Sequence, residues 1–373
     1  MSYTRLQTNF NPPTQTPYLC TRMQTLTPPI DIRALNAEQL EEWVVSIGEP
    51  KYRAKQIYQW LWKKKVTDLA QMSDLSKPLR EKLASLVAFR PIQLDKSQFS
   101  SDGTIKSRFT LHDGHKIEAV LIPVAQDKRF TVCVSTQVGC SLTCSFCATG
   151  KMKRIRNLDA AEIVDQFIQV NQQAIQHFNA PLSNIVYMGM GEPLLNYREV
   201  LRSTELFTQE SALGMSAKRI TVSTAGIAKM IRQLGDDGVR FNLALSLHAA
   251  DDTKRNEIMP INEQNNLETL MAALEYFYLK TGNEITYEYI AFNQFNDSLQ
   301  DAQHLVRLCK MNFPVKVNII EYNPVEGVEF KKSGKDRLEQ FASYLYNHGV
   351  QVTIRRSRGK DIDAACGQLA NKG

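Results

Sequence analysis

The chain has 373 residues, of which 43% are apolar and 23% charged, and its formal net charge is +6 at pH 7. This composition is typical of a globular protein, and no stretch approaches the roughly 20 apolar residues that would span a bilayer. A membrane-spanning protein is therefore excluded, and the length predicts one main domain with smaller attachments.

Residues 1–35 form a polar segment, which we expect to be a disordered tail. The first 30 residues have no apolar signal core, so we expect a cytoplasmic protein that does not contact a membrane. The same stretch contains Arg5 and Arg22 but no acidic residue, which leaves a targeting peptide open as an alternative.

Residues 36–95 predict a helical accessory domain. Asn36 and Gln39 can form a capping box for a first helix that ends at Gly48. The second and third helices, the latter starting near Ser76, each have one apolar face. Their inward residues are expected to be Ile57, Trp60 and Leu61 in the second helix, and Leu79, Leu83, Leu86 and Val87 in the third.

Lys and Arg residues gather in three runs, at residues 51–65, 151–156 and 355–360. The first run holds six basic residues and no acid. A single run of this kind is usually a solvated face. Three runs, two of them close in sequence to cysteines, indicate a polyanionic substrate such as RNA, and we expect the accessory domain to bind it.

The remainder of the chain predicts an α/β fold. Residues 96–126 form a connecting β-hairpin around the turn at 112–114, because residues 105–123 alternate in polarity. From residue 127 to 373, short strands alternate with helical stretches such as 159–177 and 265–280, which indicates parallel strands with crossover helices. The six strands are expected at 130–135, 184–191, 219–224, 241–248, 285–292 and 315–322. Six units form a partial (β/α)6 TIM-like barrel, with the chemistry at the carboxyl ends of the strands.

Three cysteines follow the first of these strands with the spacing C-x3-C-x2-C: Cys140, Cys144 and Cys147. Iron–sulfur clusters and structural zinc sites normally take four ligands, and no histidine lies near this loop. Three thiolates on a [4Fe-4S] cluster leave one iron open, to which the amino and carboxylate groups of S-adenosylmethionine (SAM) can bind. The alternative, a buried helical face of three cysteines, is disfavoured by Gly139, Gly150 and the polar residues between the cysteines.

Five segments give the chain a resemblance to a known family: CSLTCSFCATG, MGMGEPLLNY, ITVSTAG, LALSLHA and RRSRGKDIDAACGQL. Together they resemble the RlmN family of radical SAM RNA methyltransferases, over residues 36 to about 370. The resemblance implies a radical SAM barrel and methylation of adenosine C2, in the peptidyl-transferase region of 23S rRNA and beside the anticodon of tRNA. It also implies a set of SAM contacts at the strand ends: Gly191, Glu192, Ser223, Ser246, Leu247, His248 and Asn323.

The implied reaction requires a methyl carrier and a group that releases the product, and two further cysteines are candidates for these roles. Adenine C2 is electron-poor and has no lone pair, so a methyl group must arrive by a radical route on a carrier. Cys366 is the candidate carrier: its thiolate takes a methyl group from one SAM, and a second SAM supplies the radical. Cys133 is the candidate resolving thiol, which would release the product and form a disulfide with Cys366. Glu118 matches the glutamate that the family uses as a proton acceptor.

Two alternatives stay open. A related enzyme could methylate C8 of the same rRNA adenine, and the motifs do not distinguish C2 from C8. A non-catalytic RNA-binding or ribosome-assembly factor with a structural metal would explain the basic runs, but not a three-ligand site with two extra thiols. For the enzyme, we expect a monomer that takes electrons from a low-potential, flavodoxin-like donor.

Overall fold

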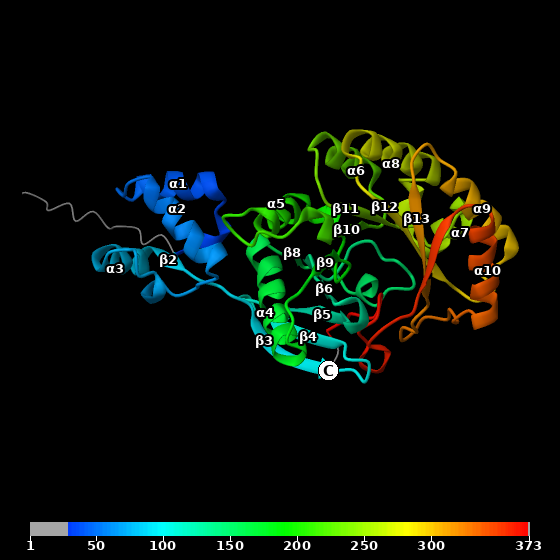
Figure 1. Cartoon of the computed structure of the whole chain (residues 1–373), viewed down its shortest axis with the longest axis horizontal. Helices are drawn as coiled ribbons and strands as arrows, with labels where there is room; N and C mark the ends of the chain where they lie inside the picture. The colour runs from blue at the N-terminus through cyan, green and yellow to red at the C-terminus, as the bar shows by residue number, and fades with distance from the viewer. Residues whose placement is uncertain (1–28, 372–373) are drawn as a thin grey trace, which may run out of the picture.

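The computed structural model describes residues 29–371, and its amino-terminal part is a small helical unit that projects from the main body (Figure 1). Residues 1–28 of the predicted tail lie outside the described residues. Residues 30–34, which we expected in the tail, are ordered as β1 (Ile30–Asp31) and a 3-10 helix (Ile32–Ala34). They are ordered because β1 pairs in parallel with β2 (Val87–Ala88), which joins the two ends of the unit.

The helices of this unit begin and end largely as the sequence predicts. The capping box before α1 (Ala37–Ser46) is confirmed, since Asn36 and Gln39 each bind the other's backbone N–H. The second helix comprises α2 (Tyr52–Tyr58) and a π-helical turn (Gln59–Lys63), and its three predicted inward residues are buried. In α3 (Lys77–Leu86) the prediction for Leu86 is wrong. Leu86 is 36% exposed, because it ends the helix just before β2.

A buried ion pair fastens the helical unit to the main body. Arg33 is 2% exposed and donates from Nη1 to both carboxylate oxygens of Asp165, at 2.8 and 2.9 Å. Asp165 belongs to α4 (Ala160–Phe178), which lies in the main body. Arg202 adds hydrogen bonds of 2.7 Å to the carbonyl oxygens of Ala34 and Leu35.

Ten strands form the large sheet of the described chain. Their order is β14-β13-β12-β11-β10-β9-β6-β5-β4-β3, with parallel pairing from β6 to β14 and antiparallel pairing from β3 to β6. The bounds are β3 (Gln93–Phe99), β4 (Ile105–Thr110), β5 (Lys116–Val124), β6 (Arg129–Cys133), β9 (Asn184–Tyr187), β10 (Ile220–Thr224), β11 (Asn242–Ser246), β12 (Ile285–Ala291), β13 (Val315–Glu321) and β14 (Gln351–Arg355). The predicted hairpin is thus continuous with the barrel sheet, and β14 adds a seventh parallel strand to the six expected.

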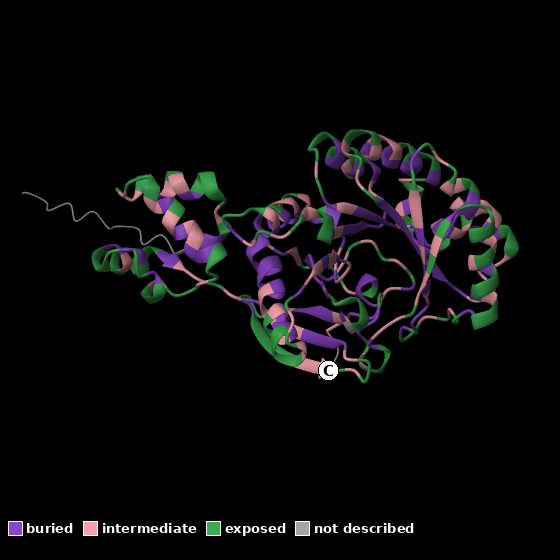
Figure 2. Ribbon diagram, in the orientation of Figure 1, coloured by how far each residue is buried: buried purple, intermediate pink, exposed green. Residues whose placement is uncertain are grey.

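Helices cover the outer face of the curved sheet. After α4 they are α5 (Tyr197–Thr208), α6 (Ala228–Asp236), α7 (Asp252–Ile258), α8 (Leu267–Thr281), α9 (Leu299–Cys309) and α10 (Lys335–Asn347). Their inward faces and the central strands of the sheet are largely buried, whereas their outward faces are exposed (Figure 2). The carboxyl ends of the parallel strands therefore meet in one place inside the partial barrel. None of the helices within residues 29–371 is both long and apolar enough to cross a bilayer.

Candidate active site

A cavity of about 520 Å3 lies inside the partial barrel, among the cysteine loop, the strand ends and the carboxyl-terminal segment 356–371. Its volume lies within the usual range for a small-molecule site. Ten residues predicted from the sequence line it: Cys133, Cys140, Cys144, Cys147, Gly191, Glu192, Ser223, Ser246, His248 and Cys366. The fold therefore brings together residues that are up to 233 positions apart in the chain (366 − 133).

The cysteine loop is closed at its base by β7 (Gln137–Val138) and β8 (Arg156–Asn157), which pair in antiparallel fashion. Within the loop, the Cys147 N–H donates to the Cys144 carbonyl at 3.2 Å, and the Ser145 N–H donates to the Ile258 carbonyl at 3.1 Å. Gly139 has φ of +75°, and a Cβ on it would collide with the Lys153 carbonyl oxygen. Only glycine fits there, because the backbone passes so close in a left-handed conformation.

Phe146 anchors the loop in an apolar cluster that is separate from the main core. Its ring contacts His248 edge-on, with centroids 4.9 Å apart, and also packs against Phe292 at 5.6 Å. Cys144 and Cys147 pack on the edge of the same cluster. The aromatic contacts hold the loop so that its three cysteines line the cavity.

The three loop thiols suit a cluster better than a single ion. Burial raises the pKa of Cys140 to about 11 and also raises the pKa values of Cys144 and Cys147, so metal binding must displace their protons. Within residues 29–371, no three His, Cys, Asp or Glu side chains converge on one ion. A cluster does not require such convergence, because each thiolate binds a different iron. The donor set therefore fits a [4Fe-4S] cluster with one iron left open.

Polar groups face this loop from the neighbouring strand ends. The Glu192 carboxylate is 4% exposed and accepts N–H groups from Leu194 at 3.0 Å and Ala225 at 2.8 Å. The Ser223 and Ser246 hydroxyl oxygens lie 3.3 Å apart. All three residues lie on the wall of the cavity. They offer a carboxylate and two hydroxyls to a ligand with amino and ribose groups.

His248 is a neutral hydrogen-bond donor in this wall. Burial, together with a smaller effect of the nearby Arg255 charge, lowers its pKa to about 3. Its Nδ1 accepts the Ile290 N–H at 3.1 Å, so the ring proton must lie on Nε2. The tautomer is therefore set by the backbone of β12.

Leu247 and Asn323 do not line the cavity. Leu247 is fully buried, and its N–H donates to the Glu288 carbonyl at 3.0 Å. Asn323 is 5% exposed and donates to the Ser357 hydroxyl at 2.9 Å, which connects the end of β13 to the carboxyl-terminal segment. Both residues support the walls from behind in this structure.

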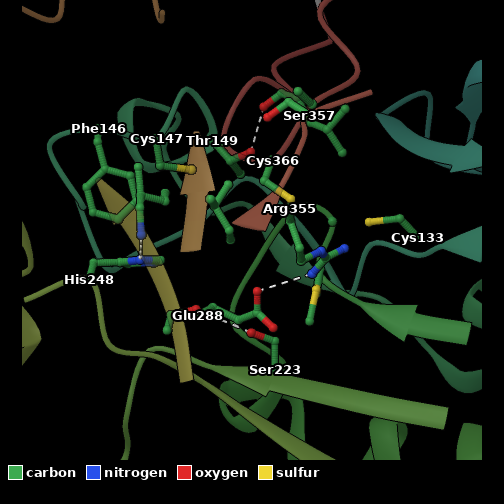
Figure 3. A pocket seen from close by; sticks show the side chains of 18 of the residues that line it. Cys133, Phe146, Cys147, Thr149, Ser223, His248, Glu288, Arg355, Ser357 and Cys366 are labelled. Atoms are coloured by element: carbon green, nitrogen blue, oxygen red, sulfur yellow. Dashed lines mark hydrogen bonds and ion pairs between the residues drawn. The ribbon is translucent and has the colours of Figure 1, made fainter. Parts of the chain in front are cut away.

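Cys133 and Cys366 lie on opposite sides of the cavity with their sulfur atoms turned toward each other (Figure 3). Cys133 ends β6 and is 6% exposed, and burial raises its pKa to about 12. Cys366 is exposed on the carboxyl-terminal segment. This segment is tied to the cysteine loop, since the Gly367 carbonyl accepts the Ala148 N–H at 2.7 Å. The cysteine loop and Cys366 are thus placed together.

Glu118 lies behind the carboxyl-terminal segment, apart from the cavity wall. It belongs to β5 and is 1% exposed. Its Oε2 accepts the N–H groups of Ala370 at 2.9 Å and Asn371 at 3.1 Å, and its Oε1 is 3.6 Å from Lys106 Nζ. In this arrangement the carboxylate fastens the segment that carries Cys366.

Two cavity residues were missed by the sequence analysis. Glu288 in β12 is 4% exposed and accepts from Arg355 Nη1 at 3.1 Å and from Asn318 Nδ2 at 2.8 Å. Arg355 was treated only as part of a basic run. A carboxylate within the otherwise apolar strand at 285–292 was the feature that could have indicated this pair.

Comparisons with known proteins agree with this geometry. Residues 30–88 match the family model of the ribosomal RNA large subunit methyltransferase N-terminal domain, and residues 134–309 match that of the radical SAM superfamily. A protein of Cytophaga hutchinsonii, "Probable dual-specificity RNA methyltransferase RlmN", is 53% identical over 95% of this chain and 97% of its own length. A protein of the same name from Christiangramia forsetii is 50% identical, over 92% of this chain and 96% of its own.

One solved structure matches nearly the whole fold. The crystal structure of a radical SAM methyltransferase from Sphaerobacter thermophilus superimposes with a TM-score of 0.85 at 38% identity. The match covers 92% of this chain and all of the other. The helical unit and the partial barrel thus occur together in a methyltransferase of known structure.

Proposed function

The chain belongs to the RlmN family of radical SAM RNA methyltransferases, and from this premise we propose that it methylates C2 of an adenosine in 23S rRNA and in tRNA. The observation that carries the proposal is the pair of opposed thiols, Cys133 and Cys366, in the cavity that also contains the three-cysteine loop. A methyltransferase acting on a nucleophile would not need this pair.

Three residues would hold the cluster, namely Cys140, Cys144 and Cys147, and SAM would fill the adjoining part of the cavity. When bound, the cluster and SAM supply a radical that removes a hydrogen atom from a methyl group. Glu192, Ser223, Ser246 and the Nε2–H of His248 would orient SAM from the cavity wall. Gly191 would bring its backbone close to the same ligand, while Leu247 and Asn323 would support the site from behind.

Cys366 would act as the methyl carrier. Its thiolate attacks the methyl carbon of one SAM, the carbon–sulfur bond of that SAM breaks, and S-adenosylhomocysteine leaves. After a second SAM has provided the radical, the methylene carbon on Cys366 joins adenine C2. Exposure of Cys366 in the cavity supports this role, because the sulfur must reach SAM and then RNA.

Cys133 would resolve the covalent bridge between protein and RNA. Its thiolate attacks the Cys366 sulfur, the bond between that sulfur and the methylene carbon breaks, and the carbon takes a proton to become the methyl group. The C2 proton is lost before this step, and a bound cluster would supply the acceptor for the electron that the radical adduct gives up. The Cys133–Cys366 disulfide left behind needs two electrons from an external dithiol before the next turnover.

Glu118 would accept the C2 proton indirectly, because its carboxylate lies apart from the cavity wall. Its carboxylate is covered by the Ala370 and Asn371 N–H groups, so a proton reaches it only after the carboxyl-terminal segment has moved. A segment that must open for each RNA substrate would provide that movement.

RNA would bind across the helical unit and the mouth of the cavity. Lys63, Lys64 and Lys65 are exposed on the helical unit, and Arg129 and Arg356 are exposed where they line the cavity. The run at 151–156 contributes less than its charge suggests, because Arg156 pairs with Asp113 and Glu162. On this proposal the enzyme is a cytoplasmic monomer that uses a flavodoxin-like electron donor.

Mass spectrometry of RNA nucleosides tests the proposal. Reconstituted enzyme, SAM and a strong reductant should convert the target adenosine to 2-methyladenosine in both an rRNA fragment and tRNA. Cys144→Ala should abolish the product, whereas Cys309→Ala, a lone half-buried cysteine outside the site, should retain it. The appearance of 8-methyladenosine would reassign the regiochemistry. RNA binding without any methylated nucleoside would favour the non-catalytic factor.

A further inference from the structure

A buried polar group in the barrel interior has no role in the scheme above. Glu288 lies in the middle of β12, Asn318 in β13 and Arg355 at the end of β14, and they form a hydrogen-bonded row across three adjacent strands. Glu288 and Arg355 line the cavity. A barrel interior of this kind is normally packed with apolar side chains, so a row of polar groups facing the cavity calls for a ligand.

Most hydrogen-bond donors of the Arg355 guanidinium are not used within the described part of the chain. Its Nη1 donates to Glu288 Oε2 at 3.1 Å, and the other N–H groups of the guanidinium have no acceptor among residues 29–371. The side chain is 38% exposed, and this exposure is toward the cavity that it lines. Glu288 in turn is held by Asn318, so the guanidinium is fixed in direction.

The guanidinium lies beside both reactive thiols. In Figure 3 it lies between Glu288 and the two sulfur atoms of Cys133 and Cys366, and its charge acts on both thiols. The scheme above places adenine C2 at the Cys366 sulfur, with Cys133 within reach of the same sulfur. Whatever flanks C2 on the base must therefore come close to Arg355.

The atoms that flank C2 in adenine are N1 and N3, and both are hydrogen-bond acceptors. Arg355 paired with Glu288 forms a group without net charge, which suits a neutral acceptor better than a carboxylate or a phosphate. The exposed Arg129 and Arg356 are better placed for phosphates. A donor directed at N1 would also oppose guanine or hypoxanthine, whose N1 carries a hydrogen, whereas N3 is an acceptor in all three bases.

We propose that Arg355, held in place by Glu288, donates a hydrogen bond to N1 or N3 of the target adenine and so directs C2 toward Cys366. The inference rests on the proposed function. It adds a base-recognition residue to that function, and a bond to N1 would also make Arg355 a determinant of adenine specificity.

Synthetic RNA with 1-deazaadenosine or 3-deazaadenosine at the target position tests the inference. Each analogue replaces one ring nitrogen by C–H and so removes one acceptor. With the reconstituted wild-type enzyme, kcat/KM should fall about 10- to 100-fold for one analogue, the usual range for loss of a hydrogen bond to a charged group. In Arg355→Met the natural RNA should be slowed by a similar factor, and the same analogue should be slowed little further.

Controls make the result specific to Arg355. Arg356→Met, which changes the neighbouring exposed arginine, should retain the full discrimination between natural RNA and the analogue. Arg355→Lys provides a second variant in case the Met variant does not fold, and it too should lose discrimination, because lysine cannot reproduce the guanidinium geometry.

The inference is overturned if both analogues are slowed by the same factors in the wild type and in the Arg355 variants. It is equally overturned if the variants change only the KM for SAM. Failure of the proposed function looks different, because the wild-type enzyme would then form no 2-methyladenosine in natural RNA and carry no methyl group on Cys366.

Discussion

Replacing Glu118 by Gln tests whether this residue fastens the carboxyl-terminal segment. The carboxylate accepts two backbone N–H groups and faces Lys106, which is itself 4% exposed. A hydrogen bond to a charged group contributes about 1.5–3 kcal/mol, and leaving a buried charge without its partner costs about 3–5 kcal/mol. The amide keeps one acceptor but removes the charge opposite Lys106. We therefore expect the free energy of opening this segment to fall by about 2–3 kcal/mol.

Hydrogen–deuterium exchange measures this opening directly. A peptide that covers residues 357–371 should exchange about 30- to 150-fold faster in the variant, since about 1.4 kcal/mol corresponds to a factor of ten. RNA methylation should slow as well, because Cys366 lies on this segment. Asp127→Asn removes an exposed carboxylate between β5 and β6 and should leave the exchange unchanged. If Glu118→Gln stopped turnover without faster exchange, the fastening role would be refuted, and direct proton transfer would be favoured.

Three further predictions concern the loop, the joint between the domains and the resolving thiol. Gly139→Ala should reduce iron content on reconstitution to near zero without unfolding the chain, because its Cβ meets the Lys153 carbonyl. Asp165→Asn should lower the free energy of unfolding by about 3–5 kcal/mol in a denaturant titration, because it leaves Arg33 buried without its partner. For Cys133, the raised pKa of about 12 means a protonated thiol at neutral pH, so the rate of adduct release should rise about tenfold per unit between pH 7 and 9.

Matched variants separate these effects from general damage. Gly238→Ala also places a side chain at positive φ, +60°, but nothing lies within 4 Å of its Cβ, so iron content should be retained. Glu81→Gln breaks an exposed ion pair with Lys77 and should change the stability by less than about 0.5 kcal/mol. A flat pH profile for release would mean that Cys133 gives its proton to a group inside the site.

Local patterns predicted most of the elements, because caps and periodicity depend on nearby residues. The capping box at Asn36 and the loop that carries Cys144 are examples. β3 was missed because it is a polar edge strand, recognisable only through its pairing with β4. The number of parallel strands was underestimated for a related reason: β14, at residues 351–355, is recognisable as a barrel strand only through its pairing with β13.

In the site, too, features that depend on nearby residues could be predicted, whereas contacts between distant segments could not. Motifs placed Ser223 and His248 at strand ends, and the fold brings both to the cavity wall. Which strand-end residues reach the cavity could not be predicted, because Asn323 turns toward Ser357, a contact between segments 34 positions apart (357 − 323). The row from Asn318 through Glu288 to Arg355 depends on the register of three strands, which no single motif encodes.

The cysteine loop and the methyl carrier are mechanically connected, and this affects how variants of either are interpreted. Ala148 and Thr149 follow the third cysteine directly, and they bind the carbonyl oxygens of Gly367 and Leu369 at 2.7 and 2.6 Å. A change that disorders the loop therefore also releases Cys366 from its place opposite Cys133. Loss of RNA methylation alone then cannot separate a missing cluster from a displaced carrier. Formation of 5′-deoxyadenosine from SAM can separate them, because it requires the cluster but not the carrier thiol.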